Sequence, residues 1–124
     1  GEPIIGQIAV ANVIINRVYD ERYPDDVCSV VTQGPTYTWK PDYPIRDKCQ
    51  FSFYCDGKSD YAPKSNAWDT SVMVAYGVMS MRTYDVTEGA THYHATYVYP
   101  DWAESKQKTV QINNHVFYRW NYGK

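Results

Sequence analysis

The chain has 124 residues, and its 12 Lys and Arg against 14 Asp and Glu give a formal net charge of −2. This length favours one compact domain with a single core, and the charge argues against nucleic-acid binding and against a polybasic membrane-surface protein. No apolar run approaches the ~18 residues that a membrane-spanning helix needs. The 13 Tyr and 4 Trp favour a surface for an amphipathic ligand such as a sugar ring, with a Tyr-rich core as the alternative.

The first helix is predicted from Pro3 to about Arg17, because apolar residues recur there on one helical face. These apolar residues are Ile4, Ile8, Ala11, Ile15 and Val18. The polar residues that interrupt the segment are Gln7, Asn12 and Asn16. A turn over residues 23–26 then leads to a second short helix around Val27 to Gln33.

The stretch from Gly34 to Ala62 is predicted to be irregular, because it combines several Pro and Gly with many aromatic residues. A loop of this length inside a small domain is usually functional, so we interpret it as one wall of a cleft. Of the three cysteines, Cys49 and Cys55 are close enough in sequence to staple this loop, which leaves Cys28 unpaired. This favours a Cys49–Cys55 disulfide in an oxidising compartment, with three reduced thiols as the alternative.

The second half of the chain changes from helix to strand. Ser65 is a good cap for a helix that runs to about Met81. Its expected core stripe is Trp68, Val72, Ala75 and Met79. After a turn at residues 85–89, Ala90 to Val98 is predicted to be a strand. A hairpin follows over residues 110–118, with Asn113 and Asn114 at its tip. Helices followed by a small β region indicate an α+β fold.

Candidate acids are few, because the chain has only four Glu residues, at positions 2, 21, 88 and 104. Glu2 differs from the others, since it directly precedes an unusually apolar helix. The helix N-terminus would lower the pKa of this carboxyl group, whereas burial beside aromatic groups would raise it. A general acid at neutral pH needs a carboxyl pKa of about 6, which desolvation in a closed cleft can supply. Glu2 is therefore a candidate general acid, and the alternative is a residue that merely charges the helix start.

Two further groups of residues are candidates for ligand contacts. In a strand, His92 and His94 would share one face and Tyr93 would point to the other. The two histidines are a possible metal site with His115 as third ligand, or one of them is a hydrogen-bonding residue of the cleft. In the segment 49–57, Gln50 and Ser52 are placed to hydrogen-bond a ligand. Phe51 and Phe53 of the same segment either pack in the core or stack on a ligand.

With these residues in view, the sequence resembles the SleB/CwlJ-type cell-wall hydrolase family, bacterial and phage enzymes that degrade peptidoglycan. The resemblance lies in four stretches, in the family's order: residues 1–3 with 6–18, 49–57, 89–95 and 112–118. The most specific is Gly-Glu-Pro followed by Gly-Gln and Asn-Arg-Val. The cysteine-containing middle and Thr-His-Tyr-His are more similar to the phage and Gram-negative branch than to the spore branch. The resemblance implies a small lysozyme-like α+β domain, mainly helical, with a short antiparallel β region in its C-terminal half.

The resemblance also implies a lytic transglycosylase or muramidase that cleaves the MurNAc-β-1,4-GlcNAc bond without metal or other cofactor. Glu2 matches the Glu of Gly-Glu-Pro and is the expected catalytic acid and base. When the 6-hydroxyl of the sugar attacks, no second carboxylate is needed, unlike in ordinary glycosidases. The expected substrate-binding residues are Gln7, Gln50, Phe51, Ser52, His92 and Tyr93.

The family usually has a helix upstream of Gly-Glu-Pro, with another Glu four residues before the position of Glu2. We therefore expect residues 1–124 to be a single catalytic domain that lacks this helix; if the upstream Glu is the acid, Glu2 only supports it. The expected partner is the glycan strand of peptidoglycan, in the periplasm or outside the cell, and the expected state is a monomer without nucleic-acid or membrane binding. The alternative functions are a metal-dependent N-acetylmuramoyl-L-alanine amidase that uses His92, His94 or His115, and a non-catalytic glycan-binding module.

Overall fold

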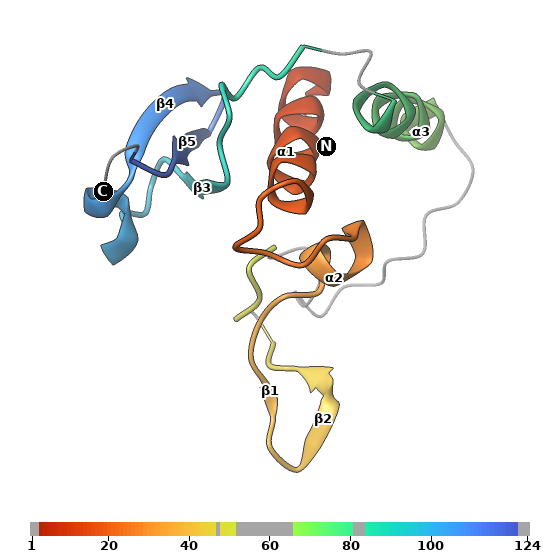
Figure 1. Ribbon diagram of the computed structural model, residues 1–124. Helices are drawn as coiled ribbons and strands as arrows, with labels where there is room; N and C mark the ends of the chain where they lie inside the picture. Colours follow the sequence, from red (N-terminus) through yellow and green to blue (C-terminus); the bar gives the residue numbers. More distant parts are fainter. Residues whose placement is uncertain (1–2, 47, 52–65, 81–83, 122–124) are drawn as a thin grey trace.

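The computed structural model describes residues 3–46, 48–51, 66–80 and 84–121, with the side chains of 37, 41–42 and 66–72 excepted. Helix α1 (Ile4–Val18) lies between a three-stranded sheet and helix α3 (Asn66–Met79), and the short helix α2 (Val27–Val31) lies below it (Figure 1). No helix in the described part of the chain is both long enough and apolar enough to cross a membrane.

Helix α1 is the centre of the fold and confirms the first predicted helix. Pro3 precedes it with φ −55°, the value that proline imposes and that a helix start accepts. The predicted apolar face is wrong as the buried one: Ile4 is 55% exposed and the other four residues of that face are only half-buried. Ala9 and Val13 are instead fully buried, in a core cluster that also contains Phe117 of the sheet. Because the helix is covered on two sides, its apolar residues extend around more of its surface than a one-sided helix would need.

Helix α2 confirms the second predicted helix and owes its start to a side-chain cap. Asp26 accepts a hydrogen bond from the backbone N–H of Ser29 at 2.8 Å. This bond holds the pKa of Asp26 below its ordinary value and supports the first turn. Val30 is the buried residue that ties α2 to the core.

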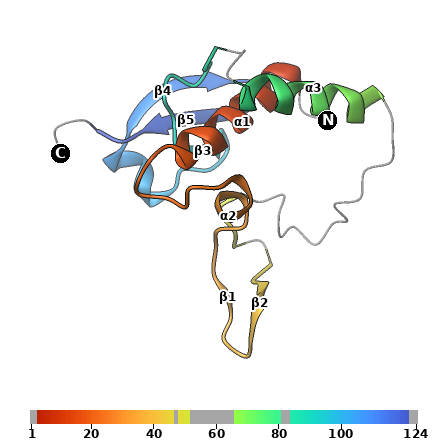
Figure 2. The same cartoon turned by 45° about the vertical axis from the view of Figure 1, so that its right-hand side comes forward.

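The prediction that residues 34–62 are irregular is wrong for residues 36–44, which form a two-stranded hairpin, β1 (Thr36–Tyr37) and β2 (Lys40–Pro44). Proline is tolerated there because both strands of a two-stranded ribbon are edges, where a missing N–H breaks no ladder. Figures 1 and 2 show this hairpin projecting from the body as an arm. Trp39 at its turn is 74% exposed and Tyr43 on β2 is also exposed, so much of the surface of these two aromatic side chains faces solvent.

The base of the arm closes on itself. The backbone N–H of Gln50 donates to the carbonyl of Gln33 at 3.1 Å. Gly34 lies beside this bond with φ +149°, a backbone region that favours glycine. A Cβ at Gly34 would come within 2.9 Å of the Cα of Cys49, so only glycine fits where the two ends of the arm meet.

Helix α3 confirms the third predicted helix, but its predicted core stripe is wrong at two positions. Met79 is 60% exposed and Ala75 is also exposed, whereas Val78 is buried. Ala75, Val78 and Met79 all line an apolar pocket with residues of α1 and α2, and of these three only Val78 is buried. The cap residue Ser65 and the side chains of Trp68 and Val72 lie outside the described residues.

The sheet has the order β3-β5-β4 and is antiparallel, from strands β3 (His92–Ala95), β4 (Gln107–Ile112) and β5 (His115–Arg119). The predicted hairpin is confirmed, with Asn113 at φ +53° between β4 and β5. A 3-10 helix, η2 (Asp101–Ser105), precedes β4. Three helices and a small antiparallel sheet in the C-terminal half confirm the predicted α+β class.

Strand β3 is shorter than the predicted strand over Ala90 to Val98, because the chain turns at residues 96–97, but it separates its side chains as the sequence predicts. His92 lies opposite Tyr118 and His94 opposite Val116, on the face that packs with Trp102 of η2. Tyr93 lies opposite Phe117 on the face that covers α1. The strand therefore carries histidines on one side and a tyrosine on the side of the main core.

Candidate functional site

A pocket of about 170 Å³ opens where the C-terminal end of α1, the segment after the arm, β3 and η2 meet. Its lining residues are Arg17, Cys49, Gln50, Phe51, His92, Tyr93 and Trp102. Four of these seven are residues that the sequence predicts as substrate-binding: Gln50, Phe51, His92 and Tyr93. The fold thus brings segments from both halves of the chain to one concave surface, as binding sites usually require.

Arg17 is the most deeply buried charged residue of this pocket, with 4% of its surface exposed. Its Nε–H donates to the backbone oxygen of Thr91 at 2.7 Å, which fixes the chain just before β3. The guanidinium also lies 4.6 Å from the ring centre of Tyr23 and 5.2 Å from that of Phe51. Burial lowers the pKa of Arg17, and Tyr23 and Tyr93 oppose this shift. Even so, an arginine keeps its charge throughout the physiological range.

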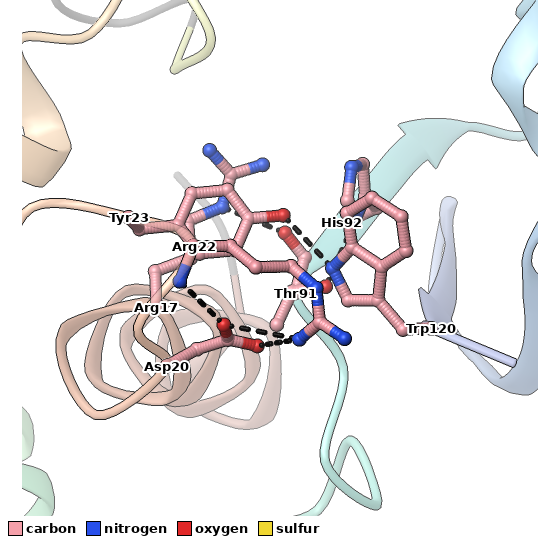
Figure 3. Close-up of polar contacts among 7 residues, drawn as sticks. All are labelled: Arg17, Asp20, Arg22, Tyr23, Thr91, His92 and Trp120. Carbon is pink, nitrogen blue, oxygen red and sulfur yellow. Dashed lines mark hydrogen bonds and ion pairs between the residues drawn. The ribbon is translucent and has the colours of Figure 1, made fainter. Parts of the chain in front are cut away.

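His92 lies at the rim of the pocket inside a group of aromatic rings (Figure 3). Its ring centre is 4.9 Å from that of Trp102 and 5.7 Å from that of Trp120. Burial, together with the charges of Arg17 and Lys106, lowers the pKa of His92 to about 4, against a smaller opposite effect of Asp20. His92 is therefore a neutral hydrogen-bonding group at physiological pH.

This depressed pKa predicts a pH dependence of stability. The unfolded chain takes up a proton near pH 6.5, whereas the folded chain resists protonation of His92 down to about pH 4. Stability from this group is present above pH 6.5 and falls as the pH drops from about 6.5 to about 4. We expect the melting temperature of the wild type to fall in this window more steeply than that of His92→Asn, as measured by circular dichroism. Parallel curves for the two proteins would contradict the prediction.

His94 is buried on the same face and has both ring nitrogens occupied. Nδ1 lies 2.7 Å from the backbone oxygen of Ala95, which can only accept, so Nδ1 carries a proton and donates it to this bond. Nε2 then accepts from the hydroxyl of Tyr118 at 2.9 Å. Burial, and to a lesser degree Tyr99, raise the pKa of Tyr118, which keeps this hydroxyl protonated.

The three histidines do not converge on one point. His115 pairs with Ala95 and its ring lies 5.4 Å from that of Tyr93, on the face opposite to His92 and His94. Among the residues that the structure describes, no three His, Cys, Asp or Glu side chains form a group that could hold a metal ion. The described residues therefore give no support to the alternative of a metal-dependent amidase.

Polar residues of α1 hold the segment that leads into β3. The amide nitrogen of Asn16 donates to Asp85 Oδ2 and to the backbone oxygen of Ala90, both at 2.9 Å. The side-chain oxygen of Asn12 accepts from the backbone N–H of Val86 at 3.2 Å. With Arg17 and Thr91, these contacts fasten residues 85–91 along α1. The polar interruptions of the apolar helix thus position the strand that carries His92 and Tyr93.

The other predicted site residues have different places. Gln7 lies on α1, about ten residues before Arg17 and thus ~15 Å from it along the helix axis. Phe51 is 1% exposed and packs in the main core, with its edge at the pocket. Glu2, Ser52 and Cys55 lie outside the described residues, so the proposed roles of these three stay predictions.

Two pocket residues were not expected from the sequence, Arg17 and Trp102. Arg17 belongs to the Asn-Arg-Val motif that carries the family resemblance, and this motif was its only signal. Trp102 stands in no motif, and its place follows from η2 packing beside β3. Neither residue has a sequence pattern that separates a pocket role from a packing role.

The cysteines allow a simple chemical test. Cys49 is disulfide-bonded and Cys28 is an exposed free cysteine. We expect the denatured, unreduced protein to react with one equivalent of a thiol reagent, from Cys28, and the reduced protein with three. The pairing with Cys55 stays a prediction, which peptide mapping of the unreduced protein checks. Three reactive thiols before reduction would contradict it.

Comparison with known proteins places this geometry in a family. A family model described as Cell Wall Hydrolase matches residues 1–118. The spore cortex-lytic enzyme of Halalkalibacterium halodurans is 29% identical over 122 residues, which cover 94% of this chain. The chain spans only 30% of the length of that relative.

Two solved structures share the fold. The catalytic domain of the germination-specific lytic transglycosylase SleB from Bacillus anthracis aligns with a TM-score of 0.66 and 25% identity, over 96% of this chain and 82% of that one. The catalytic domain of the Bacillus cereus SleB protein aligns with a TM-score of 0.64 and 24% identity, over 96% of this chain and 78% of that one, a likeness that shows the fold alone. Since the family model matches nearly the whole chain and the fold agrees with it, the chain belongs to the cell wall hydrolase family, of the SleB/CwlJ type that its sequence predicts.

Proposed function

We propose that this chain is a peptidoglycan-degrading enzyme that cleaves the MurNAc-β-1,4-GlcNAc bond of glycan strands as a lytic transglycosylase, in the periplasm or outside the cell. The observation that carries the proposal is the family match over residues 1–118. It is supported by a pocket that combines aromatic rings with polar groups, which is how proteins contact sugar rings.

The pocket offers contacts for both the face and the edge of a ring-shaped ligand. Trp102 and Tyr93 offer aromatic surface, and neutral His92 and Gln50 offer hydrogen bonds. A sugar ring has an apolar face and polar hydroxyl groups around its rim, so it can use both kinds of contact. This arrangement supports a role of the pocket in substrate binding.

We assign the proton transfer to Glu2, the residue before Pro3 at the start of α1. The pocket lies at the other end of this helix, which has 15 residues and is therefore about 22 Å long. A glycan strand is a polymer and can contact both ends of α1 at once. In this proposal the pocket anchors the strand, and bond cleavage takes place towards the start of α1.

The experiment is a digestion of purified sacculi with the full 124-residue chain, analysed by mass spectrometry. A lytic transglycosylase releases 1,6-anhydro-muropeptides, a muramidase releases reducing muropeptides, and an amidase releases stem peptides. We expect anhydro-muropeptides, with unchanged yield in excess chelator. Release of stem peptides, or tight binding to sacculi without any cleavage, would overturn the proposal in favour of an amidase or a binding module.

A further inference from the structure

We propose that Arg17 makes the pocket a carboxylate-binding site, which recognises a carboxylate carried by a saccharide ligand. The identity of this ligand as part of a glycan strand rests on the function proposed above, whereas the anion site itself rests on the hydrogen bonds and charges around Arg17.

The guanidinium of Arg17 has more N–H donors than the described residues use. An arginine side chain has five N–H groups in a planar fork. Nε donates to the oxygen of Thr91 at 2.7 Å, Nη1 to Gln33 Oε1 at 3.3 Å and Nη2 to Gln50 Oε1 at 3.4 Å. Among the described residues, one N–H on each terminal nitrogen has no acceptor, and both existing terminal bonds are long. Figure 3 shows these two nitrogens pointing away from the helix that carries them.

The charge of Arg17 is not neutralised by the groups that hold it. Its three acceptors are a backbone carbonyl and two amide oxygens, all of them neutral. Within residues 3–46, 48–51, 66–80 and 84–121, Asp20 forms its ion pair with Arg22, and no carboxylate pairs with Arg17. Arg17 is 4% exposed, and a buried cation that has no counter-charge in the described part of the chain is costly, a cost that an entering anion would remove.

The surroundings of the pocket favour an anion as well. The Nζ of Lys106 lies 4.0 Å from the ring centre of Trp120, next to His92, and Asp20 is occupied by Arg22. Arg17 and Lys106 both act to lower the pKa of His92, which is what a positive local potential does to a base. A carboxylate suits this site better than a spherical anion, because a guanidinium can bind both oxygens of a carboxylate with one N–H from each of two nitrogens.

This chemistry distinguishes the two sugars of the proposed substrate. N-acetylmuramic acid is N-acetylglucosamine with an added lactyl ether that ends in a carboxyl group. The carboxylate can come from this lactyl group on bare strands or from the stem peptide on peptide-bearing strands. In either case the site would recognise the muramic acid positions and set the register of the strand along α1.

The first test compares N-acetylmuramic acid with N-acetylglucosamine as probes for the full chain, by calorimetry and by the NMR signal of the Arg17 Nε–H group. We expect at least about tenfold tighter binding of the acid, since a charge-assisted bidentate pair is worth more than 1.4 kcal/mol. Equal binding of the two sugars would overturn the proposal.

The second test places an anion in the site without disturbing the fold. Gln50→Glu sets a carboxylate next to Nη2 of Arg17, so the variant should melt at a higher temperature and lose the preference for the acid. The matched control is Gln107→Glu, because Gln107 Oε1 accepts from Nε of Arg119 at 3.2 Å outside the pocket. The control should keep the full preference, and a preference that survives in Gln50→Glu would overturn the proposal.

Binding to glycan strands identifies the source of the carboxylate. Together with the cleavage assay, it also distinguishes a failure of this proposal from a failure of the proposed enzyme function. Tighter binding to amidase-stripped strands supports the lactyl group, and tighter binding to intact strands supports the stem peptide. Cleavage of sacculi by a wild type that binds the two sugars equally would overturn the role of Arg17 alone. A preference for the acid in a protein that never cleaves strands would overturn the enzyme function and leave the role of Arg17 supported.

Discussion

Replacing Glu2 with Gln is expected to reduce the release of anhydro-muropeptides by about 10²- to 10⁴-fold, the range that a positioned general acid contributes. Glutamine keeps the shape of the side chain but cannot give a proton to the leaving glycosidic oxygen. Because a transglycosylase uses the hydroxyl of the sugar itself as the attacking group, no second protein carboxylate can compensate. The measurement is the initial rate of muropeptide release from sacculi, with the melting temperature of the variant unchanged.

The control for this experiment is Glu104→Gln, which makes the same chemical change at an exposed residue of η2. It should retain the wild-type rate. Wild-type release by Glu2→Gln would remove this residue from the mechanism and assign the proton to a different acid.

Replacing Asp85 with Asn is expected to destabilise the fold by about 3 kcal/mol, because it removes the charge that accepts four hydrogen bonds and places an amide N–H₂ against two of the donors. Asp85 Oδ1 accepts from the backbone N–H and the hydroxyl of Thr87, at 2.9 and 2.6 Å. Oδ2 accepts from Asn16 at 2.9 Å and from the N–H of Gly89 at 3.0 Å. Asparagine has one acceptor atom, so its amide nitrogen would face donors on one side. Urea unfolding at neutral pH measures the loss.

The effect of Asp85 should depend on pH in a defined direction. Burial raises the pKa of this carboxyl group, but the hydrogen bonds from Thr87, Asn16 and Gly89 outweigh burial and lower the pKa below its ordinary value of 3.8. The stabilisation is therefore present above about pH 4 and is lost as the pH falls below it. The control Asp25→Asn, in an exposed turn, should cost little at any pH. A loss equal to that of the control would refute the role of Asp85 in fastening residues 85–91.

The sequence was most informative where local periodicity decides the structure. The 3.6-residue period and Pro3 predict α1 to within a residue of its observed end at Val18. The strand over His92 and the hairpin around Asn113 follow from β-branched and aromatic alternation with a turn residue between two runs. These elements carry or position several of the residues that line the pocket.

Where tertiary contacts decide, the sequence could not predict the outcome. An Arg in the last turn of a helix ordinarily complements the helix dipole at the surface, and only the fold shows Arg17 covered by Tyr23 and Phe51. In α3, apolar residues stand on two adjoining faces, so the choice of Val78 over Met79 depends on where α1 lies. The arm was missed because its prolines argue against strands, whereas a two-stranded ribbon accepts them.

The closed base of the arm has an evolutionary consequence. Residues 35–48 leave and re-enter the body at one place, marked by the bond between Gln33 and Gln50 and by the contact of Gly34 with Cys49. Lengthening such an excursion costs a chain little, about 0.6 kcal/mol for each doubling. Insertions and deletions should therefore accumulate in this segment among homologues, while Gly34 at its base is retained. Family members would then differ in the length of the arm and share the rest of the fold.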